Sequence, residues 1–180
     1  MMMKQSQFLS YDFDLLQLQG SLISAQRQKL AETAILRGNS HILWLDSDMI
    51  FPVDIVDRLS SHNLPIVACT YSTRTAPYKG VAYRTIGDWN SWISLDTDQV
   101  LVNAEGVGMG CMLLDVKIFD NMTRPWFEVT YNESLHEHLG EDFYFCSQAR
   151  KLGFPIMIDI ASSKLLRHLG TTGFDLCTSR

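Results

Sequence analysis

Two aspartates, Asp46 and Asp48, follow directly on the short apolar run His41–Leu45. The run is typical of a buried strand, and in open α/β sheets ligands bind beyond the carboxyl ends of the strands. Two carboxylates one residue apart can converge on one cation, and hard oxygen ligands suit Mg²⁺ or Mn²⁺ rather than zinc. Such an ion can bridge a diphosphate and stabilise the charge that grows on it as it leaves. The alternative is a plain turn, because turns favour Asp and Ser without any metal.

The chain contains a second triplet of the same form, Asp96-Thr97-Asp98. It stands in a polar stretch after Trp92–Leu95, and its residue types are typical of turns. We therefore expect a solvated hairpin turn there, and this triplet serves as an internal comparison for the first.

The elements that must position these residues follow from hydrophobic periodicity. Apolar residues at helical spacing predict a helix over residues 21–37, which Gly38 and Asn39 end. The patterns predict further helices over 52–60, 115–121 and 141–152, and strands over 41–45, 65–71, 111–114 and 156–160. Residues 72–80 are expected to form a polar loop, 81–103 a meander of short strands, and 123–139 and 161–180 irregular chain. Because helices and strands alternate in the first half, we expect a three-layer α/β/α domain with a mixed, mostly parallel sheet.

Length and composition support one ordered domain over residues 1–180, with 1–20 as an N-terminal segment of uncertain order. The chain has 180 residues, of which 46% are hydrophobic and 19% charged, and its formal net charge is −5. No basic run interrupts the acidic balance, so we expect no nucleic-acid partner. If an acidic protein binds an anionic substrate, the repulsion between their negative charges must be offset locally, and a bound divalent cation can do this.

Location and thiol chemistry are predicted from the same composition. The four cysteines, Cys69, Cys111, Cys146 and Cys177, form no Cys-x-x-Cys pair and are expected to be buried thiols in a reducing compartment. The N-terminus carries no long apolar signal region, and no stretch is long enough to span a membrane. We expect a cytoplasmic protein, and the oligomeric state has no signal in the sequence.

Four segments together resemble the GT-A glycosyltransferases, especially family-2-like bacterial and viral members. Ile42–Pro52 is similar to the Asp-x-Asp region of that family, and Gly108–Leu114 to its glycine-rich strand near the acceptor site. Gly140–Phe143 looks like the Glu-Asp motif at the start of an active-site helix, and His168 like the late metal-binding histidine. The resemblance covers roughly residues 20–170, and the ordered set is more specific than any single motif.

The resemblance implies a role for each matching position. Asp48 would coordinate Mn²⁺ or Mg²⁺ directly, Asp46 would contact the ribose or the water shell of the metal, and His168 would close the metal site. Asp142 would be the general base if the enzyme inverts configuration, which the Glu-Asp motif favours, and Glu141 would help to hold donor or acceptor. A carboxylate at a helix start is kept ionised by the helix dipole, which suits a base. The same dipole also favours acidic residues there without any catalytic duty.

Other residues leave two interpretations open. Arg74 and Lys79 either face donor phosphates, which arginine matches well, or lie in a solvated loop. Trp126, Phe127 and Tyr131 either form a platform for a sugar ring or pack against the core. A single histidine such as His168 is more commonly a surface or core residue than a ligand.

The N-terminal part departs from the family pattern. Met1–Ser10 does not have the pattern of the apolar strand with which such domains begin, so the pocket for the nucleotide base is reduced, shared or missing; Arg27 remains a candidate for its lining. The main hypothesis is transfer of a sugar from a UDP- or GDP-sugar to a glycan or other hydroxyl acceptor. A second is a non-catalytic GT-A-like module that binds glycans or a partner. A third is a haloacid-dehalogenase-type phosphatase, in which Asp46 would be the nucleophile and Asp48 an acid/base.

Overall fold

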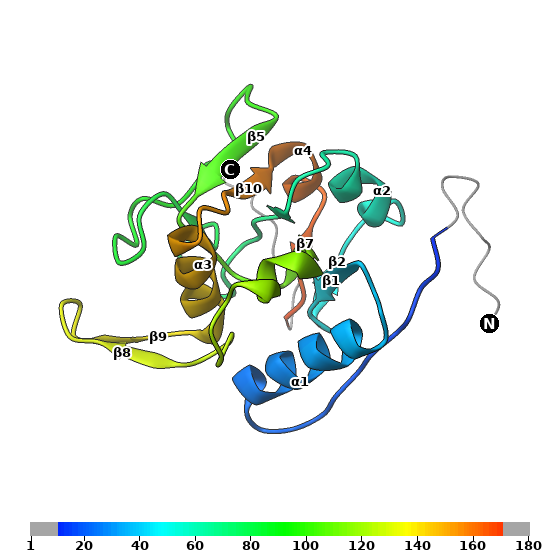
Figure 1. Cartoon of the computed structure of the whole chain (residues 1–180). Coiled ribbons are helices and arrows are strands. Elements are labelled where there is room, and N and C mark those ends of the chain that lie inside the picture. Colours follow the sequence, from blue (N-terminus) through cyan, green and yellow to red (C-terminus); the bar gives the residue numbers. More distant parts are fainter. Residues whose placement is uncertain (1–10, 171–180) are drawn as a thin grey trace.

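The computed structural model describes residues 11–170 (Figure 1). The helices are α1 (Ile23–Leu36), the 3₁₀ helix η1 (Val116–Asp120), α2 (Ile55–Ser60), α3 (Glu141–Lys151) and α4 (Ile160–Ser163). The strands are β1 (His41–Leu45), β2 (Met49–Ile50), β3 (Ile66–Ala68), β4 (Ala82–Tyr83), β5 (Leu101–Ala104), β6 (Gly106–Val107), β7 (Cys111–Asp115), β8 (Thr130–Asn132), β9 (Glu137–Leu139), β10 (Ile156–Asp159) and β11 (Arg167–His168). None of the helices among these residues is long and apolar enough to cross a membrane.

Five strands form the central sheet in the order β1-β7-β3-β10-β5. The sheet is mixed, as expected, but the prediction that it is mostly parallel is wrong. Only β3 and β10 pair in parallel, whereas β1 with β7, β7 with β3, and β10 with β5 pair antiparallel. The physical reason is that β7 inserts between β1 and β3 and runs against both, so these two strands point the same way without contacting each other.

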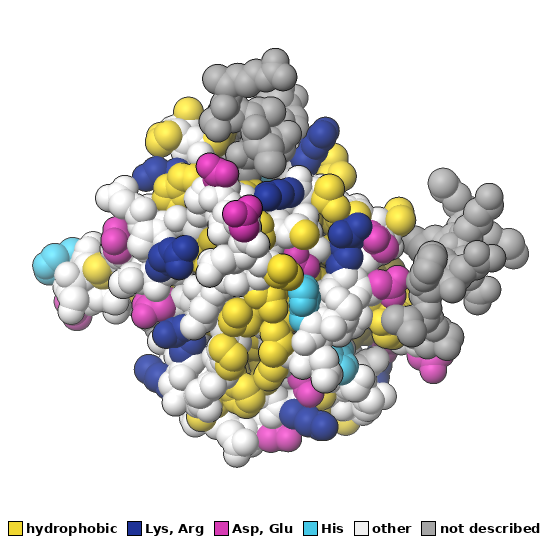
Figure 2. Space-filling view, turned by 90° about the horizontal axis from the view of Figure 1, so that it is seen from above, with side chains coloured by type: hydrophobic (Ala, Val, Ile, Leu, Met, Phe, Trp, Pro, Cys, Tyr) yellow, Lys and Arg dark blue, Asp and Glu magenta, His cyan; other side chains and the backbone are white. Residues whose placement is uncertain are grey.

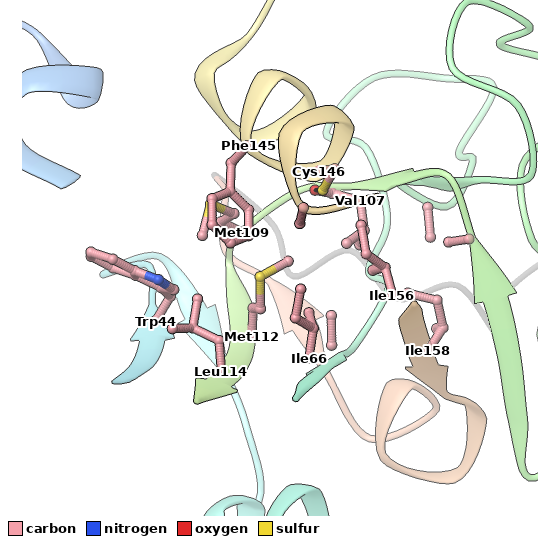
Figure 3. Packing of buried hydrophobic residues seen from close by; sticks show 14 of the residues in the cluster. Trp44, Ile66, Val107, Met109, Met112, Leu114, Phe145, Cys146, Ile156 and Ile158 are labelled. Atoms are coloured by element: carbon pink, nitrogen blue, oxygen red, sulfur yellow. Dashed lines mark hydrogen bonds between the residues drawn. The ribbon is translucent and has the colours of Figure 1, made fainter. Parts of the chain in front are cut away.

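Side chains on both faces of the sheet are buried. On β3 and β7, Ile66, Ala68, Met112 and Leu114 belong to a cluster with residues of α1 and α3, including Phe145 (Figure 3). The alternate residues Val67, Cys69, Cys111 and Leu113 pack with Ile55 and Leu59 of α2. Successive side chains on a strand point to opposite faces, so helices cover both faces of this mixed α/β sheet.

The two long helices end in the same way. Gly38 has a φ of 77°, and the amide of Asn39 donates to the carbonyl of Ala34 at 3.1 Å. Gly153 has a φ of 87°, and the amide of Phe154 donates to the carbonyl of Ala149 at 3.1 Å. Both are Schellman motifs, in which glycine adopts the left-handed conformation that ends the helix. The predicted ends of helices 21–37 and 141–152 are therefore confirmed to within a residue or two.

Several short elements were not predicted. Residues 123–139, expected to be irregular, contain the β8–β9 hairpin, and the tail expected to be loop-like contains α4 and β11. The triplet Asp96-Thr97-Asp98 lies in a bend with both aspartates exposed, as expected of a solvated turn, but it does not close a hairpin, because β5 pairs only with β10.

The remaining sequence expectations concern the thiols, the N-terminal segment and the surface. Cys69, Cys111 and Cys146 are buried free thiols, and burial raises the pKa of the Cys146 thiol to about 12; Cys177 and Met1–Ser10 lie outside the described residues. Residues 11–20 form no helix or strand, although Asp14 pairs with Arg37 at 2.7 Å. On the face shown in Figure 2, acidic and basic side chains are interspersed rather than gathered by sign.

Candidate functional site

The turn after β1 is held from two sides. The amide of Asp46 donates to the carbonyl of Gly110 at 3.1 Å, which ties the turn to the start of β7. On the other side β2 pairs with β11, so that His168 lies opposite Met49, and the amide of Leu169 donates to the carbonyl of Asp48 at 2.7 Å. The pairing of β2 with β11 therefore brings His168, which is remote in sequence, beside Asp48.

The Asp46 side of the turn contacts a buried arginine. Arg27 lies on the buried face of α1 and is 8% exposed. Its Nη2 lies 3.1 Å from Oδ1 of Asp46, and its Nε lies 3.1 Å from Oε1 of Glu141 at the start of α3. The guanidinium also lies over the Trp44 ring, 5.3 Å from its centroid. Arg27 thus joins the end of β1 to the start of α3 and compensates two carboxylates there.

The Asp48 side contains a different cationic partner. Nη2 of Arg74 forms an ion pair with Oδ2 of Asp48, and Nε of Arg74 donates to Nε2 of His168 at 3.0 Å. Nε2 of His168 lies 3.5 Å from Oδ2 of Asp48. Nδ1 of His168 lies 2.9 Å from the carbonyl oxygen of Ser72. Since Arg74 can only donate, Nε2 is the acceptor and the proton of the imidazole sits on Nδ1, facing Ser72.

These atoms can be tested against the divalent cation that the resemblance implies. Among residues 11–170 no group of three or more His, Cys, Asp or Glu side chains could by itself enclose a metal ion. Mg²⁺, however, is usually held through one or two protein ligands and completes its shell with substrate phosphates and water. A histidine whose second nitrogen donates to a backbone carbonyl is also the usual form of a metal-binding histidine. Asp48 and His168 therefore fit an open site. Asp46 is paired with Arg27, as Asp48 is with Arg74, and its role toward a cation stays a prediction.

The carboxyl groups at the start of α3 have a distinct electrostatic environment. Glu141 and Asp142 occupy the first helical turn, and the amide of Phe143 donates to Oδ1 of Asp142 at 2.8 Å. Burial, and next the charge of Glu141, raise the pKa of Asp142 to about 6, although the Phe143 amide and Arg27 act in the opposite direction. A carboxylate with a pKa near neutrality can both accept and release a proton at physiological pH.

Tyr71 is a site residue that the sequence did not reveal. It is 7% exposed, its hydroxyl oxygen accepts from the amide of Gly110 at 3.2 Å, and its ring meets the His168 ring edge-on with centroids 5.2 Å apart. Burial, and then the charges of Asp46 and Asp142, raise the pKa of Tyr71. Tyr71 therefore adjoins the Asp48 side of the turn through the His168 ring. Sequence offers no signal for this, because the contacts join segments that are far apart in the chain.

Tyr71 also explains the glycine-rich run before β7. A Cβ atom at Gly108 would lie 2.6 Å from the Tyr71 hydroxyl oxygen, and one at Gly110 would lie 2.7 Å from the same ring and oxygen. Such distances exclude a side chain at either position unless Tyr71 moves. The run is thus glycine-rich because the phenol packs against its backbone.

Other predicted residues lie apart from this group. Lys79 donates to Asn90 at 3.1 Å rather than to the aspartates. Trp126 and Phe127 are each 3% exposed and belong to the core, whereas Tyr131 is 48% exposed, so the three do not form one platform. A different aromatic group adjoins α3: the ring of Trp89 contacts those of Tyr83 and Phe143, with centroids 5.0 and 5.4 Å apart. Burial, and next the charge of Asp142, raise the pKa of Tyr83.

Comparison with known proteins gives distant similarity. No protein-family model matches the chain. The chain is 27% identical over 123 residues to the mannan polymerase complex subunit MNN9 of Candida albicans, and the match covers 61% of this chain and 33% of MNN9. The chain thus spans about a third of the length of that curated relative. The crystal structure of A197 from STIV superposes with a TM-score of 0.57 at 20% identity, covering 82% of this chain and 68% of A197. That likeness concerns the fold alone.

Proposed function

We propose that this protein is a metal-dependent GT-A glycosyltransferase with a three-layer α/β/α domain, which moves a sugar from a nucleotide diphosphate donor to a hydroxyl acceptor. One observation carries the proposal: the ion pairs of Arg27 join the aspartate turn after β1 to the carboxyl pair that opens α3. The residues that we propose as cation ligands and a carboxyl group with a pKa of about 6 are thereby brought to one end of the sheet. Sugar transfer from a diphosphate needs both.

The residues divide the chemistry between them. Asp142 accepts the proton of the acceptor hydroxyl. The oxygen of that hydroxyl attacks the anomeric carbon of the donor sugar while the bond from this carbon to the diphosphate breaks. Because the attack comes from the side opposite the diphosphate, the configuration of the anomeric carbon is inverted. Asp48 and His168 would hold Mn²⁺ or Mg²⁺, which supplies positive charge to the departing diphosphate. Arg27 keeps Asp46 and Glu141 in place, and Arg74 contributes a cation near the phosphates.

The similarity to a mannan polymerase complex subunit makes GDP-mannose the first donor to test, followed by UDP-sugars. The proposed test is calorimetric titration of GDP and GDP-mannose with and without Mn²⁺. We expect Mn²⁺-dependent binding that is lost in Asp48→Ala and retained in Asp98→Ala, which changes the exposed second triplet. Full binding by Asp48→Ala would show that the metal assignment is wrong.

A second candidate function is a non-catalytic module that binds a glycan or a partner protein. The observation that favours it is that Asp46, Asp48 and Glu141 are each paired with an arginine already. Binding of mannose oligosaccharides without transfer or hydrolysis of any nucleotide sugar, in the presence of Mn²⁺, would support this candidate. Measurable transfer to such an oligosaccharide would exclude it.

A further inference from the structure

The loop of residues 72–80 presents an arginine to the two atoms that the proposed function assigns to a divalent cation. Nη2 of Arg74 pairs with Oδ2 of Asp48, and Nε of Arg74 donates to Nε2 of His168 at 3.0 Å. A neutral imidazole has a single nitrogen lone pair that can accept. Arg74 and a divalent cation therefore cannot use Nε2 of His168 at the same time.

The same loop also fixes the state of the histidine. The carbonyl oxygen of Ser72 lies 2.9 Å from Nδ1 of His168, which keeps the imidazole proton on Nδ1 and leaves Nε2 free to bind a cation. Two residues further on, Arg74 occupies that prepared lone pair. The loop thus orients His168 for binding a cation, and it also supplies the guanidinium of Arg74, which occupies the place of that cation beside Nε2.

Arg74 can leave without unfolding the loop. Its side chain is 51% exposed, so its outer part is already in solvent. The backbone of the loop is held independently, because Ser72 and Gly80 form a bridge and the amide of Thr73 donates to the carbonyl of Lys79 at 2.9 Å. Rotation of one long side chain is enough to release Asp48 and His168.

We propose that Arg74 is a displaceable latch that competes with divalent cations for Asp48 and His168. The proposal rests on the metal assignment in the proposed function and adds a regulation of that site. At present Arg74 makes one ion pair with Asp48 and one hydrogen bond with His168, whereas the several oxygens of a diphosphate offer a guanidinium bidentate contacts. An anionic donor draws Arg74 away from the pair, so donor and cation bind cooperatively, and the cation binds weakly without a donor.

The test measures Mn²⁺ binding by calorimetry without any nucleotide, on the wild type, Arg74→Met and Lys79→Met. The two variants remove the same charge from the same loop, but Lys79 contacts Asn90 rather than the aspartate. We expect Arg74→Met to bind Mn²⁺ about five- to tenfold more tightly, in line with the loss of the partly exposed contacts that Arg74 makes with Asp48 and His168, and Lys79→Met to stay within about twofold of the wild type. Adding Asp48→Ala to Arg74→Met should abolish the gain.

The outcomes separate the latch from the proposed function. Equal Mn²⁺ affinity in the wild type and Arg74→Met, or an equal gain in Lys79→Met, would overturn the latch and leave the glycosyltransferase proposal standing. Tighter binding in Arg74→Met alone would support the latch even if no donor were turned over. Absence of Mn²⁺ binding in all the proteins, Arg74→Met included, would also overturn the latch, whereas the metal assignment would then be decided by the titration of GDP with Mn²⁺.

Discussion

At the residue scale, the position of Asp142 makes ionisation of its carboxyl group unfavourable and so lowers the stability of the folded protein. Raising its pKa from 3.8 to about 6 corresponds to about 3 kcal/mol against the ionised form. Burial is the main cause and the neighbouring Glu141 the second, while Arg27 offsets part of the penalty. The resulting carboxylate is a stronger base than one in water, which is the property that proton abstraction requires.

The first prediction concerns the pH dependence of transfer. The base acts in its ionised form, so kcat/KM should fall as the pH drops below about 6, with the slope of a single proton. In Asp142→Asn the rate should fall by at least about a hundredfold, consistent with loss of a general base, and this limb of the profile should disappear. Asp98→Asn, in the exposed triplet, should keep the wild-type profile. A wild-type rate that is constant between pH 5 and 7 would exclude Asp142 as the base.

The second prediction concerns the free energy of unfolding. The pKa of Asp142 in the folded protein is higher than the ordinary value of 3.8, so the folded protein binds the proton more tightly than the unfolded chain does. The resulting stabilisation is fully present below about pH 4 and is lost as the pH rises through about 6. Asp142→Asn, which is always neutral, should therefore unfold at higher urea than the wild type at pH 7.5, by up to about 3 kcal/mol. At pH 4 the difference should be small; equal stability at pH 7.5 would contradict the assigned environment.

The third prediction compares two arginines that both lie over a tryptophan ring and pair with an acidic residue. Arg27 is buried and paired twice, whereas Arg124 is 63% exposed and paired with Glu32. Arg27→Met should cost about 2–4 kcal/mol in urea unfolding, because it leaves Asp46 and Glu141 uncompensated. Arg124→Met should cost about 0.5 kcal/mol or less. Equal costs would mean that Arg27 is not needed to join β1 and α3.

At the scale of elements, Tyr71 packs so closely against the glycine-rich run before β7 that each requires the other. The fourth prediction uses the different atoms that each new Cβ would meet. At Gly108 the nearest atom is the Tyr71 hydroxyl oxygen at 2.6 Å, and the next is at 3.2 Å; at Gly110 ring carbons also lie at 2.7 Å. Each Gly→Ala change should cost about 1–3 kcal/mol through overpacking. Tyr71→Phe should rescue Gly108→Ala but not Gly110→Ala.

Thermal or urea unfolding of the three single and two double variants measures this coupling. Tyr71→Phe alone should cost about 1 kcal/mol, since it leaves the Gly110 amide without its acceptor. If Tyr71→Phe rescued both alanine variants or neither, the hydroxyl would not be the atom that requires glycine at position 108.

The long elements could be predicted from sequence because each has a local cause. The glycines at 38 and 153 determine where α1 and α3 end. The helix at α1 was predicted from apolar residues that are mostly exposed, among them Ile23 and Ile35, whereas its buried face consists of Ser24, Arg27, Ala31 and Ala34. The strand before Asp46 is recognisable as an apolar run, although β1 lies at the edge of the sheet and only Trp44 in it is buried. The short pairs β8–β9 and β2–β11 were not predicted, because two or three residues carry no measurable period and their pairing depends on distant partners.

The same distinction applies to the site. The segments that contain the candidate site residues were recognisable, and the structure brings Arg27, Asp46 and Glu141 into contact, as it does Arg74, Asp48 and His168. Their separation into two ion-paired groups could not be predicted, because arginine partners leave no spacing signal. Tyr71 was missed for the same reason, and the direction of β7 was missed because an apolar strand has the same pattern whichever way it runs.

At the scale of the whole molecule, the candidate site depends on distant parts of the chain at once. α1 supplies Arg27, the turn after β1 supplies Asp46 and Asp48, the start of α3 supplies Glu141, and β11 supplies His168. Each part is fixed in the sheet or against it by its own packing. A ligand that contacts several of these parts must therefore bind the folded chain and not the unfolded chain. Its binding then adds to the free energy of unfolding of the whole domain.

The last prediction follows from this linkage. With Mn²⁺ present, GDP at about a hundred times its dissociation constant should add about 2.7 kcal/mol to the free energy of unfolding relative to Mn²⁺ alone, and should raise the melting temperature by about 5–10 °C. Because the cation and the diphosphate share the Asp48 side of the site, the joint shift should exceed the sum of the separate shifts. Asp48→Ala should lose the excess, while Asp98→Ala should keep it. Purely additive shifts in the wild type would indicate separate binding sites for GDP and Mn²⁺ and would exclude a shared diphosphate site at Asp48.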